Sequence, residues 1–531
     1  MTPAAKEARE RLDKRGGAPP NAPPFSMSAA RFVSEEEHLE RQGVRFDVPV
    51  NREYHDLKKE ISNFCSSDKR DGLTTEKCEE MLPKVRRFEE LVSGAAELGI
   101  PGQMTKWGRE LVYACAARIA RATDLKPGSE AAEFAVTRLT QATGDASSPQ
   151  RSEDQDEQWD RHMPGWGWPQ SRTVAAEGLT ALAAKPEFCN AAVCDLLLML
   201  EKDVAPEVRY QVISRCISLY HTSPKTMWAI IRHAAANEER LAILYGLLEG
   251  ALLRLRPSEV HDLVEQVYRR IVDRDAGEAR GACAVFFVRR AIWEKEQGSA
   301  EHLERFLHSP LKFQPELSQI VSAVADLATF EEEGRDPQEC EAVRRWTFAF
   351  YRRTTEASMA EVKSRLQRLT GVDRWPDEDQ KAMQALGHLA LMIVMNLRGA
   401  IGEEGQRLTA YQLKRFAGEA GEAIEALCEV PFAHIAYDLF DVLRQLSEAD
   451  APGALKWLHK SVMTARADAV QYEHLAATRI VEIVETYLAR HRDLFREPGP
   501  QSQLLDILDT FVEAGWTEAN GLTYRLSEVF R

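Results

Sequence analysis

The chain has 531 residues, of which 44% are hydrophobic and 28% charged, a composition that excludes global disorder and is typical of soluble proteins with a sizeable core. Its formal net charge of −15 argues against broad binding to nucleic acid or anionic membranes, because neutralising phosphate needs a surplus of Lys and Arg. The nine cysteines include no Cys-x-x-Cys pair, so we expect reduced thiols in a cytoplasmic protein.

The N-terminal part of the chain divides into three segments. Residues 1–50 are rich in proline and charge and have no apolar run, which predicts a flexible segment and no secretory signal. Residues 51–141 carry apolar residues at helical spacing, which predicts an N-terminal helical region. The expected helices are 52–66, 74–97, 103–122 and 128–141. Residues 142–165 are acidic and without periodicity, which predicts a solvated linker.

Two tryptophans, Trp166 and Trp168, follow this linker in the stretch "PGWGWPQSR". They stand directly before a helix that Ser171 is suited to cap. In one interpretation they pack over the first helix of the next region. In the other they form an exposed hot spot for a partner, where Trp is enriched. The Gly-Trp turn recurs in "AGWTEANGLTYRL" near the end of the chain, which favours the packing role.

Residues 166–306 contain a repeated pattern. After Arg209, apolar residues occur at offsets of 3, 4, 7 and 10, and the same offsets recur after Arg172, which lies 37 residues earlier. Less complete copies follow Arg240 and Arg280. Apolar stretches between the copies predict second helices at 188–203, 224–238 and 258–274. Helix pairs that repeat at about 30–47 residues predict an α-solenoid.

One of these copies resembles a known family. In "DVAPEVRYQVISRC", Asp203 precedes Val208-Arg209 and an apolar helix, and this spacing is similar to the HEAT repeat. The resemblance implies a ladder of acidic and basic residues that bridge neighbouring units, formed here by Asp203, Arg209 and Arg172. We therefore expect an all-α fold, an α-solenoid of antiparallel helix pairs, in which residues 307–531 form C-terminal helical repeats.

A wider resemblance concerns "WGWPQSRTVAAEGLTAL", "DVAPEVR" and the closing "FVEAGWTEANGLTYRLSEVFR". These stretches are similar to the helical C-terminal regions of large bacterial STAND-type ATPases, some of which act in phage defence. The resemblance implies a sensing or scaffolding module whose partner is a protein, such as a larger ATPase or effector. The chain itself has no G-x-x-x-x-G-K-[ST] motif. We expect a non-enzymatic scaffold or sensor without a metal or cofactor.

Two other classes of function stay open. An all-α, metal-dependent phosphohydrolase of the HD type would need several His and Asp ligands on facing helices. The candidate ligands are His233, His261, Asp262 and Asp275, and a second His-Asp dipeptide is His55-Asp56. The amphipathic pattern around His261 favours a surface position for it instead. A nucleic-acid-binding solenoid would use arginines along one face, namely Arg254, Arg256, Arg269 and Arg270.

The longest apolar run, Leu389 to Leu397, is about half of the ~20 residues that span a bilayer. We therefore expect this run to form a buried core helix, and we expect no membrane partner.

Overall fold

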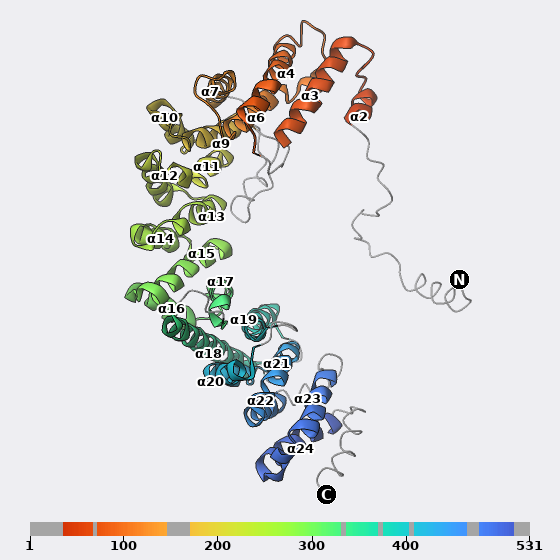
Figure 1. Cartoon of the computed structure of the whole chain (residues 1–531), viewed down its shortest axis with the longest axis vertical. Coiled ribbons are helices and arrows are strands. Elements are labelled where there is room, and N and C mark those ends of the chain that lie inside the picture. Colours follow the sequence, from red (N-terminus) through yellow and green to blue (C-terminus); the bar gives the residue numbers. More distant parts are fainter. Residues whose placement is uncertain are drawn as a thin grey trace, which may run out of the picture. The chain divides into compact units, whose positions relative to one another are not determined.

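The computed structural model describes residues 35–66, 72–145, 170–330, 336–369, 375–402, 408–464 and 477–513 (Figure 1). These residues form helices joined by turns and include no strand, which confirms the all-α prediction. They divide into two compact units, and the division falls inside helix α9 (Ser171–Ala183). The described residues of unit 1 are those up to 145 together with 170–181, and those of unit 2 begin at 182.

Unit 1 is built around helices α3, α4, α6 and α7, which contact one another. Its helices are α2 (Glu35–Arg41), α3 (Pro49–Ser66), α4 (Thr75–Ser93), α5 (Gly102–Thr105), α6 (Gly108–Ala120), α7 (Glu130–Thr143) and the first part of α9. The rings of Tyr54 and Phe88 pack at 4.8 Å between centroids in its core. Ser129 caps α7 by accepting a hydrogen bond from the N–H of Ala132 at 3.2 Å.

Helix α2 lies within the segment that the sequence predicts to be flexible, and residues 1–34 of that segment lie outside the described residues. Two ion pairs join α2 to α3. Glu36 accepts from Arg52 at 2.7 Å, and Glu35 accepts from Lys58 at 2.6 Å. The linker predicted at 142–165 falls almost entirely outside the described residues, as do Trp166 and Trp168.

Unit 2 contains fifteen longer helices in its described part. They are α10 (Ala191–Leu200), α11 (Pro206–Ile213), α12 (Pro224–Asn237), α13 (Leu241–Gly250), α14 (Pro257–Ile271), α15 (Gly277–Arg289), α16 (Gln297–His308), α17 (Gln314–Ala323), α18 (Pro337–Arg368), α19 (Asp377–Ile401), α20 (Ala410–Leu427), α21 (Ala433–Leu446), α22 (Ala451–Thr464), α23 (Ala477–Arg490) and α24 (Pro498–Glu513).

The helices of unit 2 contact their second neighbours in the sequence as well as their first. In the odd-numbered series, α11 contacts α13, α13 contacts α15, and the contacts continue through α17, α19 and α21 to α23. In the even-numbered series, α10 contacts α12 and α12 contacts α14, and each helix from α16 to α22 contacts the next even-numbered helix. A hydrogen bond between Glu265 and His302 joins α14 to α16. Figure 1 shows α12, α14 and α16 on one side of the unit and α13, α15 and α17 on the other. The contacts between the helices of unit 2 therefore run in two series, one odd-numbered and one even-numbered.

The repeated apolar residues form part of the core. The arginines that mark the repeated pattern stand at the start of four successive odd-numbered helices, α9, α11, α13 and α15. The apolar residues that follow them are buried, and those of the second and third copies are Val212, Ile213, Cys216, Leu219, Ile243, Leu244 and Leu247. The predicted second helices correspond to α10, α12 and α14. These elements therefore form where the sequence periodicity places them.

Helix α11 is shorter than its apolar pattern predicts. It ends at Ile213, and Cys216 and Leu219 belong to a separate 3₁₀ helix, Cys216–Leu219. The hydroxyl of Ser214 donates to the carbonyl of Tyr210 at 2.6 Å, a bond that competes with regular helix geometry and bends helices. Cys216 and Leu219 nevertheless stay buried in the core.

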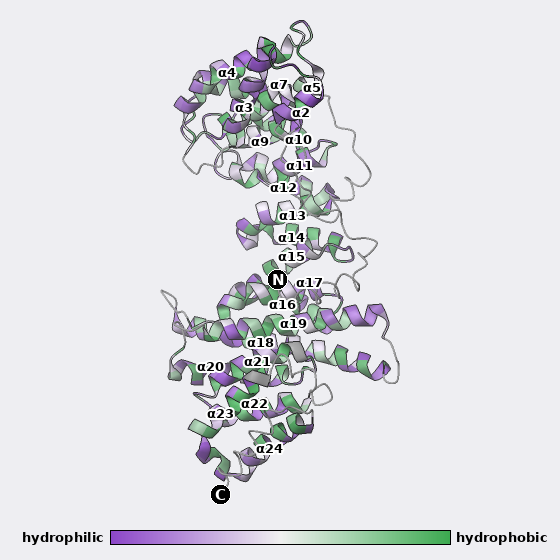
Figure 2. Cartoon of the chain, turned by 90° about the vertical axis from the view of Figure 1, so that its right-hand side faces the viewer, coloured by the Kyte–Doolittle hydropathy of each residue, from purple (hydrophilic) through white to green (hydrophobic). Residues whose placement is uncertain are grey.

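The apolar run that begins at Leu389 lies in α19. By length and composition α19 could cross a bilayer, and no other helix in the described ranges meets that test. Half of its most apolar window is buried, and Leu389, Ile393 and Leu397 are fully buried. Helix α19 contacts α17, α18 and α21. Figure 2 shows hydrophilic as well as hydrophobic residues along α18 and α19. These are the features of a core helix.

Glu296 caps α16 and gives a test of the local structure. Its carboxylate accepts from the N–H groups of Gly298 at 2.9 Å and Ser299 at 2.6 Å. The Ser299 side chain and these N–H groups lower the pKa of Glu296 to about 2. A depressed pKa in the folded state adds stability above the ordinary pKa, and that stability is lost as the pH falls towards 2.

We expect Glu296→Ala to lower the free energy of unfolding by about 1 kcal/mol at pH 7. Thermal denaturation at a series of pH values should show this difference disappearing near pH 2, and a constant difference would contradict the assignment.

Candidate functional site

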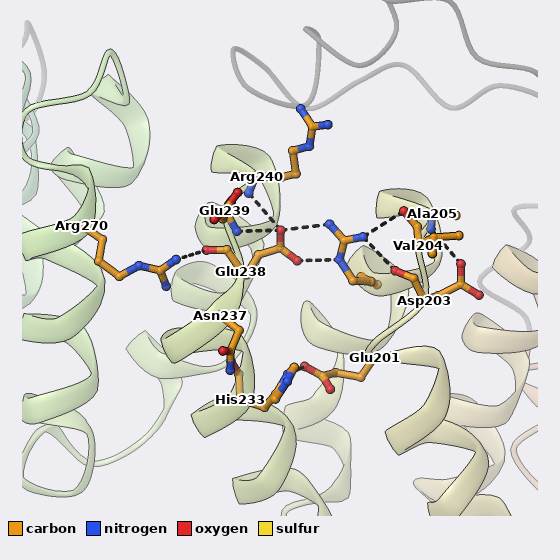
Figure 3. A network of polar contacts seen from close by, with 11 residues as sticks. Glu201, Asp203, Val204, Ala205, His233, Asn237, Glu238, Glu239, Arg240 and Arg270 are labelled. Carbon is orange, nitrogen blue, oxygen red and sulfur yellow. Dashed lines mark hydrogen bonds and ion pairs between the residues drawn. The ribbon is translucent and has the colours of Figure 1, made fainter.

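A polar network around Glu238 joins α11 to α12 (Figure 3). Arg209, in α11, donates to groups at the end of α12 and in the turn before α11. Its Nε and Nη2 donate to the two carboxylate oxygens of Glu238 at 2.7 and 3.1 Å. Its Nη1 donates to the backbone carbonyl of Asp203 at 2.8 Å. The side chain of Glu238 is only 5% exposed, so this bidentate pair is largely desolvated. Arg209 therefore fixes the turn before α11 to the end of α12.

Arg270 extends this network from α14 to the C-terminal end of α12. It donates to the carbonyls of Ala235 and Glu238, both at 2.7 Å. The last carbonyls of a helix have no partner within the helix, and positive charge is favourable beside them. Figure 3 shows Arg270 reaching Glu238, whose carboxylate accepts from Arg209. Glu238 thus connects α11, α12 and α14.

The residues predicted to form the repeat ladder take different positions in the structure. Arg209 and Asp203 meet through the backbone carbonyl of Asp203, while the Asp203 carboxylate accepts from the N–H of Ala205 at 2.8 Å. Arg172, in unit 1, donates to the carbonyl of Asp145 at 3.1 Å. The carboxylate that pairs with Arg209 belongs to Glu238, which is not among the residues predicted from the sequence.

A second bridge joins α15 to α17. The Nε and Nη2 of Arg280 donate to the two carboxylate oxygens of Glu316 at 2.7 and 2.8 Å. The side chains of Arg280 and Glu316 are 10% and 0% exposed. The Tyr268 hydroxyl donates to the same carboxylate at 3.0 Å, and burial together with that negative charge raises the pKa of Tyr268. All of these groups are held in the interior of unit 2.

Polar bridges join every successive pair of helices in the even-numbered series. From α10 to α24 the partners are Glu201, directly after α10, and His233 at 2.6 Å, Ala235 O and Arg270 at 2.7 Å, Glu265 and His302 at 2.6 Å, Glu304 and Arg353 at 2.8 Å, Glu419 and Arg344 at 2.7 Å, Glu425 and Lys460 at 3.3 Å, and Asp506 and His459 at 3.0 Å. Most of these pairs oppose an acidic and a basic residue. The same kind of contact therefore recurs along the whole series.

The candidate metal ligands do not assemble into a metal site. His233 pairs with Glu201, whose pKa is raised by burial while the hydrogen bond from His233 opposes that rise. The ring of His261 stacks on Phe286 at 6.4 Å between centroids, and Asp262 is exposed. His55, in the second dipeptide, is buried edge-on against Phe46. The described part of the chain contains no group of three or more His, Cys, Asp or Glu residues that could hold a metal ion.

The arginines proposed as a nucleic-acid face are mostly engaged within the chain. Arg254 donates to the carbonyl of Glu249 at 3.1 Å, and Arg269 lies 3.7 Å from Glu265. Arg270 caps α12 as described above. Arg256 is exposed at the start of α14. Three of the four therefore make a contact within the chain, and the side chain of Arg269 is still 75% exposed.

A cavity of about 330 Å³ lies on the odd-numbered series, between α13, α15 and α17. Its lining combines both charge signs with one aromatic ring, and includes Tyr245, Glu249, Arg254, Glu278, Arg289 and Gln319. Burial raises the pKa of Tyr245, and the Glu249 and Glu278 charges add to that rise. Of these residues only Arg254 is among the candidates predicted from the sequence. Three consecutive helices of one series supply the lining, so the cavity depends on how they are stacked.

No protein-family model matches the chain, and no curated protein matches it either. The resemblances to HEAT repeats and to STAND-associated helical regions therefore rest on the residues quoted for them.

Proposed function

We propose that the chain is a HEAT-like α-solenoid of antiparallel helix pairs that acts as a non-enzymatic scaffold or sensor for a protein partner. The observation that carries this proposal is the bridge between every successive pair of even-numbered helices from α10 to α24. In repeat proteins each unit contacts its neighbours by the same interface, and the stacked units present an extended surface for binding. The two series of helix contacts are consistent with that organisation.

The cavity on α13, α15 and α17 is the binding surface that this proposal favours. Tyr245 offers an aromatic anchor, and the charges around it can pair with side chains of either sign. Protein interfaces concentrate their binding energy in such aromatic and arginine residues, with charged groups around them that set specificity. The partner would be a larger ATPase or effector in the cytoplasm of a bacterium, within a multi-component system such as phage defence.

Capture of the partner from the native host tests this proposal. The tagged full chain should retain a defined protein, identified by mass spectrometry. We expect the double variant Tyr245→Ala, Glu278→Lys to retain at least about tenfold less of it, because a hot-spot residue contributes about 2 kcal/mol or more. Glu301→Lys makes the same charge change at an exposed position on α16, and this variant should bind the partner like the original chain. Equal retention by all three proteins would contradict the proposed surface.

The two alternatives predicted from the sequence have direct tests. Stoichiometric Mn, Fe or Zn in the purified protein that is lost in His261→Ala would replace the scaffold proposal with a metal-dependent enzyme. Retention of nucleic acid on a filter at low salt, lost as salt rises, would support the nucleic-acid alternative.

A further inference from the structure

Two cysteine side chains meet at the start of α10. The Sγ atoms of Cys189 and Cys194 lie 3.8 Å apart. Asn190, between them, caps α10 by accepting from the N–H of Val193 at 3.1 Å. Cys189 therefore precedes the cap and Cys194 is the fourth residue of the helix, the two positions whose side chains meet across a helix start. The cap thus holds the two thiols together.

The surroundings of this pair differ from those of the buried cysteines. Cys189 and Cys194 are partly exposed, whereas Cys78, Cys216 and Cys283 are buried. The Cys194 thiol donates to the Ser223 hydroxyl at 3.6 Å, and Ser223 directly precedes α12. Burial raises the pKa of the Cys189 thiol, while hydrogen bonds from nearby hydroxyls oppose that rise. Because Cys189 and Cys194 are both partly exposed, a small reagent can reach both thiols.

We propose that Cys189 and Cys194 are a redox-sensitive dithiol site, which forms a reversible intramolecular disulfide by exchange with a small-molecule disulfide. One cysteine, as its thiolate, attacks a sulfur of the reagent, and a mixed disulfide forms while the first small thiol leaves. The other cysteine then loses its proton and attacks the protein sulfur of that mixed disulfide, which expels the second small thiol. Two protein thiols are oxidised and one small disulfide is reduced to two thiols.

The geometry favours the second step. The sulfurs need to approach by less than 2 Å, from 3.8 Å to the disulfide bond length of about 2.05 Å. The step is also intramolecular, so the attacking thiol is already held beside its target. Bond formation would take Cys194 away from Ser223, and so change a contact between the start of α10 and the start of α12. Cytosolic disulfides are characteristically transient and redox-sensing, which agrees with a reversible bond.

Mass spectrometry of the full chain tests the site directly. The protein is incubated with oxidised glutathione, its remaining thiols are alkylated, and it is digested with trypsin. The peptide 173–202 contains Cys189 and Cys194 and no other cysteine. We expect this peptide to carry no alkyl group after oxidation and two after reduction. A peptide that stays doubly alkylated, or that carries separate glutathione adducts, would overturn the proposal.

Two comparisons separate a built site from chance pairing. In glutathione redox buffers, we expect the equilibrium constant for the disulfide to be at least about tenfold larger in the folded chain than in urea. An equal or smaller constant in the folded chain would mean that the fold does not bring the thiols together. In Cys194→Ser, glutathione should remain attached to Cys189, because the resolving thiol is absent. If Cys194→Ser released glutathione from Cys189 as fast as the original chain does, the assignment would also be overturned.

Discussion

Glu316→Ala is expected to lower the free energy of unfolding by about 3–5 kcal/mol, because removing one partner of a buried ion pair leaves the other charge desolvated and unpaired. Arg280 is only 10% exposed and would lose both of its bonds to that carboxylate. The Tyr268 hydroxyl would lose its acceptor as well. Thermal and urea denaturation of the full chain measure the loss. Hydrogen exchange in α15 and α17 should show that it is concentrated there, since arrays of helices can unfold in parts.

Asp273→Ala is the matched control for this prediction. Asp273 pairs with Lys312 at 2.9 Å in the same part of unit 2, but the two side chains are 76% and 52% exposed. An exposed pair contributes about 0–1 kcal/mol, so this variant should remain close to the original stability. The double variant Glu316→Leu, Arg280→Met should be more stable than Glu316→Leu alone, because the second substitution removes the unpaired charge. If Glu316→Ala and Asp273→Ala had equal effects, burial would not strengthen the bridge.

The helices of the repeated region could be predicted because their apolar residues recur at fixed offsets from an arginine. The partner of Arg209 could not, because the pairing with Glu238 spans 29 residues and crosses α12. The HEAT resemblance directs attention to Asp203, which lies only six residues before Arg209. The number of residues between the partners of such bridges does contain a signal. Arg280 and Glu316 are 36 residues apart, and Glu265 and His302 are 37 apart, close to the repeat length. A search for opposite charges at that spacing would have found these bridges.

The cavity shows the same limit of sequence reasoning. Tyr245 and Glu249 are four residues apart, as are Glu278 and Ala282, so helical spacing alone places each pair on one face. Which helices stack beside one another is decided by packing between helices that another helix separates in the sequence, as between α13 and α15 and between α15 and α17. The contact between the two cysteines could not be predicted for another reason. Cys189 and Cys194 have no metal or thioredoxin spacing, and only the cap at Asn190 brings them together.

The short α11 also explains the second large expected effect, which concerns Gly250 at the end of α13. A Cβ atom at this position would lie 2.1 Å from the backbone oxygen of Ser214, in the bend where α11 ends. The nearest atoms belong to the backbone, so no side chain can move aside to make room. We expect Gly250→Ala to lower the free energy of unfolding by about 1–3 kcal/mol or more, the cost of overpacking a close helix contact. The midpoint of thermal denaturation measures this effect.

Gly418→Ala provides the opposite case. Gly418 lies within α20, and a Cβ atom there would have no atom within 4 Å. Alanine is the better helix former, so this variant should gain about 0.5–1 kcal/mol. Both substitutions add the same methyl group to a helix, and they differ in whether a neighbouring backbone occupies the space. Shifts of opposite sign would therefore show that α13 and α11 are held in contact at Gly250. A gain in both variants would mean that α13 can move away from Ser214, and that the stacking of the odd-numbered series is not fixed at this point.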